Sequence, residues 1–129
     1  LKIAEHLESL GKFKIIYPGL ESHPDHQLAC LQANAGFGFG GLMAIDLETF
    51  ENARKFVMEI QNGGWGLNAV SLGYYQSLLS ISGSSTSSEI DADVQEKNQL
   101  SPGLVRVSVG FLGAVQNQVA AFEEALTKI

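Results

Sequence analysis

The sequence predicts an α+β fold in which amphipathic helices cover one face of a small β-sheet. Apolar residues recur at helical spacing in four segments, and short β-prone runs lie between those segments. The 129 residues are 45% hydrophobic and 17% charged, which suffices for one domain with a proper core and excludes a disordered chain. We therefore expect a layer of helices packed on a layer of strands.

The first helix is expected over residues 1–10, and it ends at Gly11, where a left-handed C-cap costs little. Its apolar stripe consists of Leu1, Ala4, Leu7 and Leu10. A β-prone run follows over residues 13–17 and is stopped by the turn pair Pro18-Gly19. The chain therefore opens with a helix followed by a short strand.

A second helix and a second strand come next. Pro24 suits the first turn of a helix that ends near Asn34, and Ser22 or His23 is its expected N-cap. The residues that this helix is expected to turn inward are Leu28 and Leu31. The following strand is expected over residues 42–47.

The third helix is expected over residues 49–61. Its inward stripe is Phe50, Ala53, Val57 and Ile60, and its outer side carries Glu51, Arg54, Lys55 and Glu59. Residues 67–72 are a third strand candidate, residues 82–88 a serine-rich loop and residues 89–102 a polar connection. A strand over residues 104–110 and a last helix complete the domain. The inward residues of the last helix are Val115, Val119, Phe122 and Leu126.

Two short motifs each place a polar residue inside an apolar strand. The first, residues 70–73, contains Ser71, and the second, residues 104–110, contains Arg106 and Ser108. Alternation sends one set of the second motif to the helix side, namely Val105, Val107 and Val109, and the other to the opposite face, namely Leu104, Arg106 and Ser108. No helix is left to cover that opposite face. Because a guanidinium keeps its charge, Arg106 needs a carboxylate, a phosphate or water.

Two partners for Arg106 remain open at this point. Alternation places Asp46 on a sheet face together with Leu42 and Ala44, so a cross-strand salt bridge from Asp46 to Arg106 is one. A ligand carboxylate is the other. Either would contribute about 1–3 kcal/mol in a sheltered setting.

Other motifs favour ordinary structural roles. Residues 36–41 fit G-x-G-x-x-G, but a helix precedes them and a strand follows, the reverse of a dinucleotide site, so we interpret them as a connection. The hydroxyl-rich segment 82–88 is interpreted as a mobile linker. The histidines lack the spacing of a zinc site, and we expect no metal. The three histidines are His6, His23 and His26.

Charge and composition exclude several classes of partner. A formal net charge of −6 argues against nucleic acid, and the apolar stretches are too short to span a bilayer. The single cysteine, Cys30, is expected to be a small core residue. Because it cannot form an internal disulfide and no signal peptide is recognised, a cytoplasmic setting is expected.

Four motifs in order carry a resemblance to a known family. They are residues 17–26, Phe39-Gly40-Gly41, Val70-Ser71-Leu72-Gly73 and residues 101–110. Together they resemble the C-terminal domain of the Cys/Met-metabolism family of pyridoxal-phosphate enzymes, a fold-type I architecture. The resemblance covers essentially the whole chain. It implies that residues 1–11 are the end of an interdomain helix and residues 12–129 the C-terminal small domain.

Within this family, the segments 71–78 and 82–89 look most like plant-type methionine γ-lyases, which convert methionine to methanethiol, 2-oxobutanoate and ammonia. The resemblance implies that Arg106 binds both oxygens of the substrate α-carboxylate and that Ser71 helps to hold the same group. Thr86 would line the pocket near the substrate side chain. Val70, where cystathionine-handling relatives can carry a glutamate, favours a thioether substrate such as methionine.

The same resemblance implies what this chain lacks. The lysine and the other groups that hold pyridoxal phosphate belong to the N-terminal domain, so we expect no catalytic residue and no bound cofactor here, and no activity from this piece alone. The expected partners are that N-terminal domain, a sulfur amino acid and further copies in a homotetramer. Ser87 and Gln76 depart from the family pattern, where histidine and an acidic residue are common.

Three alternatives remain beside the methionine-lyase interpretation. The chain could be the equivalent domain of a related cystathionine γ-synthase or lyase. It could be a stand-alone regulatory module that binds an amino acid without chemistry, since small α+β sandwiches host many functions. It could also be an interaction domain that docks through its uncovered sheet face.

Overall fold

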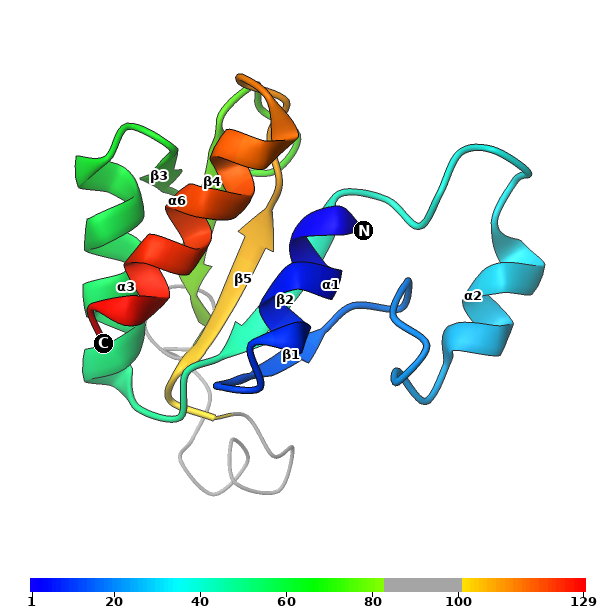
Figure 1. Cartoon of the computed structure of the whole chain (residues 1–129), viewed down its shortest axis with the longest axis horizontal. Helices are drawn as coiled ribbons and strands as arrows, with labels where there is room; N and C mark the ends of the chain where they lie inside the picture. Colours follow the sequence, from blue (N-terminus) through cyan, green and yellow to red (C-terminus); the bar gives the residue numbers. More distant parts are fainter. Residues whose placement is uncertain (83–100) are drawn as a thin grey trace.

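The computed structural model describes residues 1–82 and 101–129, which form a mixed sheet with helices on one face (Figure 1). The strands are β1 (Lys14–Ile16), β2 (Leu42–Asp46), β3 (Gly66–Asn68), β4 (Ser77–Ile81) and β5 (Leu104–Ser108). The helices of the described residues are α1 (Lys2–Ser9), α2 (His26–Gln32), α3 (Phe50–Asn62) and α6 (Val115–Thr127). The α+β prediction is confirmed.

The sheet has the strand order β1-β2-β5-β4-β3. Only β3 and β4 run parallel, and the other neighbours are antiparallel. In the register, Arg106 of β5 lies opposite Ala44 of β2 on one side and opposite Ser80 of β4 on the other. Arg106 is therefore at the centre of the sheet.

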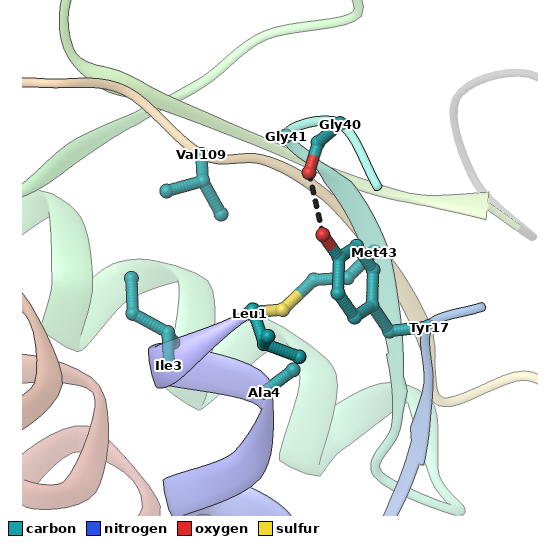
Figure 2. Close-up of a pocket in the computed structure, with 8 residues that line it drawn as sticks. All are labelled: Leu1, Ile3, Ala4, Tyr17, Gly40, Gly41, Met43 and Val109. Carbon is teal, nitrogen blue, oxygen red and sulfur yellow. Dashed lines mark hydrogen bonds between the residues drawn. The ribbon is translucent and has the colours of Figure 1, made fainter. Parts of the chain in front are cut away.

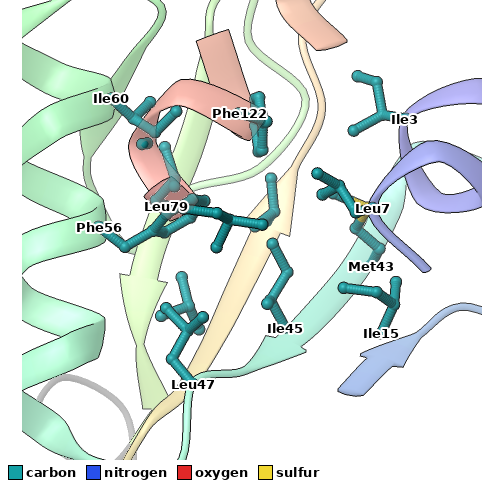
Figure 3. Packing of buried hydrophobic residues seen from close by; sticks show 14 of the residues in the cluster. Ile3, Leu7, Ile15, Met43, Ile45, Leu47, Phe56, Ile60, Leu79 and Phe122 are labelled. Atoms are coloured by element: carbon teal, nitrogen blue, oxygen red, sulfur yellow. The ribbon is translucent and has the colours of Figure 1, made fainter. Parts of the chain in front are cut away.

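One face of the sheet packs against α1, α3 and α6 and forms the hydrophobic core (Figure 3). Ile45, Leu79 and Val105 from three strands are fully buried. Phe56 of α3 and Phe122 of α6 meet edge to face above them, with ring centroids 5.8 Å apart. This layer supplies most of the apolar burial that stabilises the domain.

The helical stripes differ by one position from the prediction. In α1, Ile3 is buried while Leu1 and Leu10 are 48% and 39% exposed, because the helix begins at Lys2 and ends at Ser9. In α3, Thr49 is the N-cap and accepts a hydrogen bond from Asn52 N. That start leaves Phe50 exposed at the first turn, and Phe56, which the prediction missed, is buried.

The second helix, α2, stands away from the rest of the molecule (Figure 1), and none of its residues is buried. Leu28 and Leu31 are 52% and 84% exposed, and Cys30 is exposed as well. The predictions that the two leucines point inward and that Cys30 is a core residue are wrong. Periodicity identified an apolar side of this helix, but no described element covers it.

The region around residues 67–81 also differs from the prediction. Strand β3 ends at Asn68, so the motif 70–73 is not part of a strand, although the sequence placed it in one. A strand that was not predicted, β4, follows, and all five of its residues are buried. A strand buried on both faces shows no alternation of apolar and polar residues, which explains why it was missed.

No helix in the described ranges 1–82 and 101–129 has the length and apolarity to span a membrane.

Candidate functional site

The candidate site is built around β5, whose two faces differ as the sequence predicted. Val105 and Val107 are fully buried in the helix-covered core. Arg106 and Ser108 alternate with them and therefore face the opposite side of the sheet. We call this the polar face; it carries Arg106 and Ser108 of β5 and Ser80 of β4, the register partner of Arg106.

The chain between β3 and β4, residues 69–76, crosses the polar face and is held there by hydrogen bonds. Arg106 Nη2 donates to Ser71 O at 3.1 Å and to Ala69 O at 3.4 Å. Gly73 N donates to the Ser108 hydroxyl at 3.1 Å. The two motifs that the sequence singled out are thus in contact, through the backbone of the first and the side chains of the second.

The second end of this crossover is fixed by backbone contacts with the segment after β5. Tyr75 O accepts hydrogen bonds from Phe111 N at 2.9 Å and from Leu112 N at 3.0 Å. Gly110 lies between these groups, where an added Cβ would overlap Tyr75 O and the carbonyl carbon of Gln76. Only glycine permits this close approach of the two backbones, which explains why the residue at position 110 is glycine.

The positive charge of Arg106 has no acidic partner in the described part of the chain. No ion pair joins Arg106 to a carboxylate there, and its Nε is buried without a hydrogen-bond acceptor. Asp46 lies opposite Leu104, and its Oδ1 accepts a hydrogen bond from Glu48 N at 2.9 Å. The Asp46–Arg106 salt bridge is therefore wrong, and the ligand alternative is left.

The other site residues named from the sequence are placed as follows. Val70 is 59% exposed and Ser71 is exposed in the crossover, where the carbonyl of Ser71, not its hydroxyl, bonds Arg106. Thr86 and Ser87 lie outside the described residues. Gln76 donates a hydrogen bond to Gly64 O at 3.3 Å. Ser80 also lies on the polar face, opposite Arg106. The sequence did not single it out because β4 was not predicted.

The glycine-rich segment connects α2 to β2, as predicted, and its backbone turns at three positive φ angles. These belong to Gly36 (85°), Gly38 (70°) and Gly40 (81°). Tyr17 donates a hydrogen bond from its hydroxyl to Gly40 O at 2.7 Å. The segment precedes a strand, so it lacks the helix N-terminus that a phosphate site of this type uses.

The histidines make separate contacts. His6 Nε2 lies 2.8 Å from Glu123 Oε2, joining α1 to α6. His26 Nδ1 lies 3.0 Å from Pro18 O, and its Nε2 lies 3.4 Å from Cys30 Sγ. Within residues 1–82 and 101–129, no three metal-ligating side chains come together.

An apolar cavity of about 160 Å³ lies on the helix-covered side, between α1 and β2 (Figure 2). Ile3, Met43 and Val109 line it, and the Tyr17 hydroxyl at its edge is already bonded to Gly40 O. The cavity is on the other side of the sheet from Arg106, and Tyr17 is the one residue of its lining with a polar side-chain group. It therefore carries no chemistry that we can assign.

The lysines of the described residues do not fit the attachment of pyridoxal phosphate, which requires an amine that can form a Schiff base in a pocket. Lys12 Nζ caps the end of α6 by bonding Leu126 O at 2.5 Å and Ile129 O at 2.9 Å. Lys128 pairs with Glu59 at 2.7 Å. The remaining described lysines, Lys2, Lys14 and Lys55, are exposed. None of the five lysines that the structure describes, Lys2, Lys12, Lys14, Lys55 and Lys128, therefore lies in a pocket suited to this attachment.

Comparison with known proteins agrees with the motifs. The chain matches the family model described as Cys/Met metabolism PLP-dependent enzyme over residues 1–127. It is 49% identical over 98% of its length to methionine gamma-lyase of Arabidopsis thaliana and covers 29% of that protein. It is 39% identical to cystathionine beta-lyase of Lactococcus lactis, over 98% of this chain and 32% of that protein.

Solved structures show the same relationship. A crystal structure of cystathionine gamma synthase from Xanthomonas oryzae, in complex with cystathionine, matches 98% of this chain with a TM-score of 0.80 and 28% identity, and the match covers 33% of that protein. The chain thus spans about a third of the relatives it matches. On the motifs, the fold and these similarities together, the chain belongs to the Cys/Met metabolism family of pyridoxal-phosphate-dependent enzymes.

Proposed function

We propose that this chain is the C-terminal, substrate-carboxylate-binding domain of a pyridoxal-phosphate-dependent methionine γ-lyase. In this proposal residues 1–11 are the end of an interdomain helix and residues 12–129 form the domain. The observation that carries it is the environment of Arg106, a sheet-borne guanidinium held in place by Ser71 O and Ala69 O with no acidic partner among the described residues.

The hydrogen bonds of Arg106 leave part of its donor set for a ligand. Nη2 is engaged with the crossover, whereas Nη1 donates to no described residue. An arginine that is anchored through Nη2 and unpaired at Nη1 suits a carboxylate, because a hydrogen bond from a charged donor to a carboxylate oxygen is stronger than a hydrogen bond between neutral groups. The crossover contacts fix the guanidinium before a ligand arrives, which lowers the entropy cost of binding.

Holding the α-carboxylate orients the amino acid. When bound in the complete enzyme, pyridoxal phosphate supplies the electron sink for carbanion chemistry. Fixing the carboxylate with Arg106 would orient the bonds at the substrate Cα for reaction, so Arg106 would contribute to both affinity and rate. Ser71 contributes through its backbone, and Thr86 and Val70 are proposed to line the pocket for the substrate side chain.

Methionine is the proposed substrate because the Arabidopsis relative at 49% identity is a methionine gamma-lyase and because residue 70 is an apolar valine, 59% exposed. Cystathionine is the second candidate, since the Lactococcus relative at 39% identity is a cystathionine beta-lyase. Comparing kcat/KM of the complete enzyme for the two amino acids separates the candidates. We propose that the N-terminal cofactor domain and a second copy of the enzyme complete the site.

The test of this function is Arg106→Ala in the complete enzyme. We expect the KM for methionine to rise about ten- to a hundredfold, since a hydrogen bond to a charged group contributes about 1.5–3 kcal/mol and about 1.4 kcal/mol corresponds to a factor of ten. Arg106→Lys keeps the charge but loses the planar guanidinium that bonds the crossover carbonyls and the ligand through different nitrogens, so its KM should be intermediate. The matched control is Arg54→Ala, an arginine on the exposed side of α3 that contacts only Glu51 and Met58 among the described residues.

Two results would overturn the assignment. A KM close to that of the unmodified enzyme in Arg106→Ala would remove the carboxylate role. An equal rise in Arg54→Ala would show that loss of positive charge, and not loss of this contact, weakens binding. Steady-state kinetics with methionine, together with circular dichroism to verify folding of each variant, decide between these outcomes.

A further inference from the structure

The polar face contains a second side chain with an unsatisfied polar atom, Ser80 of β4. Ser80 is 1% exposed, and its buried hydroxyl oxygen makes no hydrogen bond to any residue of the ranges 1–82 and 101–129. In the antiparallel pairing of β4 and β5, Ser80 lies directly opposite Arg106. Side chains at opposed positions on one face of such a pair have Cβ atoms about 4.5–5.5 Å apart, so the two residues are immediate neighbours.

The unpartnered atoms of the two residues are complementary. Arg106 Nε is also buried and has no acceptor in the part of the chain that the structure describes, and its N–H can only donate. A serine hydroxyl can accept through either lone pair, and it turns about a single side-chain torsion. A buried donor and a buried acceptor left apart are costly, whereas one hydrogen bond between them removes both penalties.

We propose that Ser80 is a positioning residue for Arg106: its hydroxyl accepts the Nε–H when a substrate carboxylate occupies the outer side of the guanidinium. This inference rests on the proposed function of Arg106. The crossover carbonyls of Ala69 and Ser71 hold Nη2, and Ser80 holds Nε, so the plane of the guanidinium is fixed from two sides. The outer side with Nη1 then points to the ligand.

The hydrogen bond between Ser80 and Arg106 should affect substrate affinity more than the stability of the fold. A guanidinium whose plane is fixed loses less rotational freedom when a carboxylate binds. Without the Ser80 hydroxyl, the Arg106 guanidinium can rotate about its remaining hydrogen bonds to the crossover carbonyls. The loss should therefore appear mainly in the KM of the amino acid, since the contact is formed equally in the bound substrate and in the transition state.

The experiment is Ser80→Ala in the complete enzyme with pyridoxal phosphate bound. We expect the KM for methionine to rise about three- to tenfold and kcat to change by less than about twofold. Ser80→Thr, which keeps a hydroxyl, should restore the KM. The matched control is Ser77→Ala, which removes a buried hydroxyl from the same strand on the opposite face, where it accepts from Gly110 N at 3.1 Å; its KM should not change.

A double-mutant cycle tests whether Ser80 acts through Arg106. In the Arg106→Ala background, Ser80→Ala should leave the KM unchanged, because the group that it positions is gone. An additive rise in that background, a normal KM in Ser80→Ala, or an equal rise in Ser77→Ala would each overturn the inference. A normal KM in Arg106→Ala alone would instead overturn the proposed function, so the two failures are distinguishable.

Discussion

The two faces of the sheet differ in what holds them together. On the helix-covered face, Val105 and Val107 are fully buried in the apolar cluster to which α3 and α6 also contribute, and apolar contacts have no preferred direction. On the polar face, the same strand presents Arg106 and Ser108, which hold the crossover by individual hydrogen bonds. One strand of five residues thus takes part in apolar packing on one side of the sheet and in directed hydrogen bonds to the crossover on the other.

This difference has a practical meaning for mutations. Apolar packing contributes through the area removed from water and through the absence of cavities, so it determines whether the domain folds. A hydrogen bond contributes little net stability but fixes the position of the groups that it joins. Substitutions on the covered face should therefore reduce stability, and those on the polar face should mainly change the position of the crossover.

The largest expected effect is on the covered face. Phe122→Ala removes a fully buried ring that packs on Phe56 and should lower the free energy of unfolding by about 3–5 kcal/mol. Urea denaturation of the purified protein measures it. The control is Phe111→Ala, whose ring is 80% exposed and which should cost far less. Similar losses in the two variants would contradict the division of the molecule into these faces.

A smaller effect is expected on the polar face from Ser108→Ala. The Gly73 amide would lose its acceptor at 3.1 Å, and we expect a loss of about 1 kcal/mol, as for an ordinary hydrogen bond. Hydrogen exchange at the Gly73 amide should accelerate while exchange at the Val105 amide stays nearly constant, because the crossover opens without the core. Uniform acceleration at both amides would show that the crossover is part of the cooperative core.

Much of the covered face was predictable because its residues follow simple periods. The strict alternation around Val105 and Val107 identified β5, and helical spacing identified α6 with Phe122 and Leu126 inward, as the structure confirms. The placement of Arg106 on the opposite face followed from the same alternation. Local periodicity is sufficient when an element has one apolar and one polar side.

The prediction failed where burial depends on partners distant in sequence. Strand β4 is buried on both faces, so it lacks alternation, and its serines resemble those of the adjoining polar segment. The apolar side of α2 was expected to face the core, but apolar character does not reveal which element covers it. The contact from Arg106 to Ser71 uses a carbonyl oxygen, which every residue has, so no side-chain pattern could indicate it.

An effect as small as that of Ser108→Ala is expected from a hydroxyl at the edge of the covered face. Tyr17→Phe removes the hydrogen bond to Gly40 O at 2.7 Å and should lower the free energy of unfolding by about 1 kcal/mol at neutral pH. Burial raises the pKa of Tyr17 above its ordinary value of 10.0, because the phenolate is poorly solvated there. The folded protein therefore retains this proton longer than the unfolded chain.

The sign of the pH dependence follows from that shift. The stabilisation linked to Tyr17 is fully present below pH 10.0, the unfolded value, and it is lost as the pH rises from there through the raised folded pKa. Tyr17→Phe lacks this titration, so the stability difference between the two proteins should shrink above that pH. Urea unfolding of both proteins at neutral and at alkaline pH measures the difference. A constant gap would mean that the Tyr17 hydroxyl titrates alike in the folded and unfolded states, and that its bond to Gly40 does not shelter it from solvent.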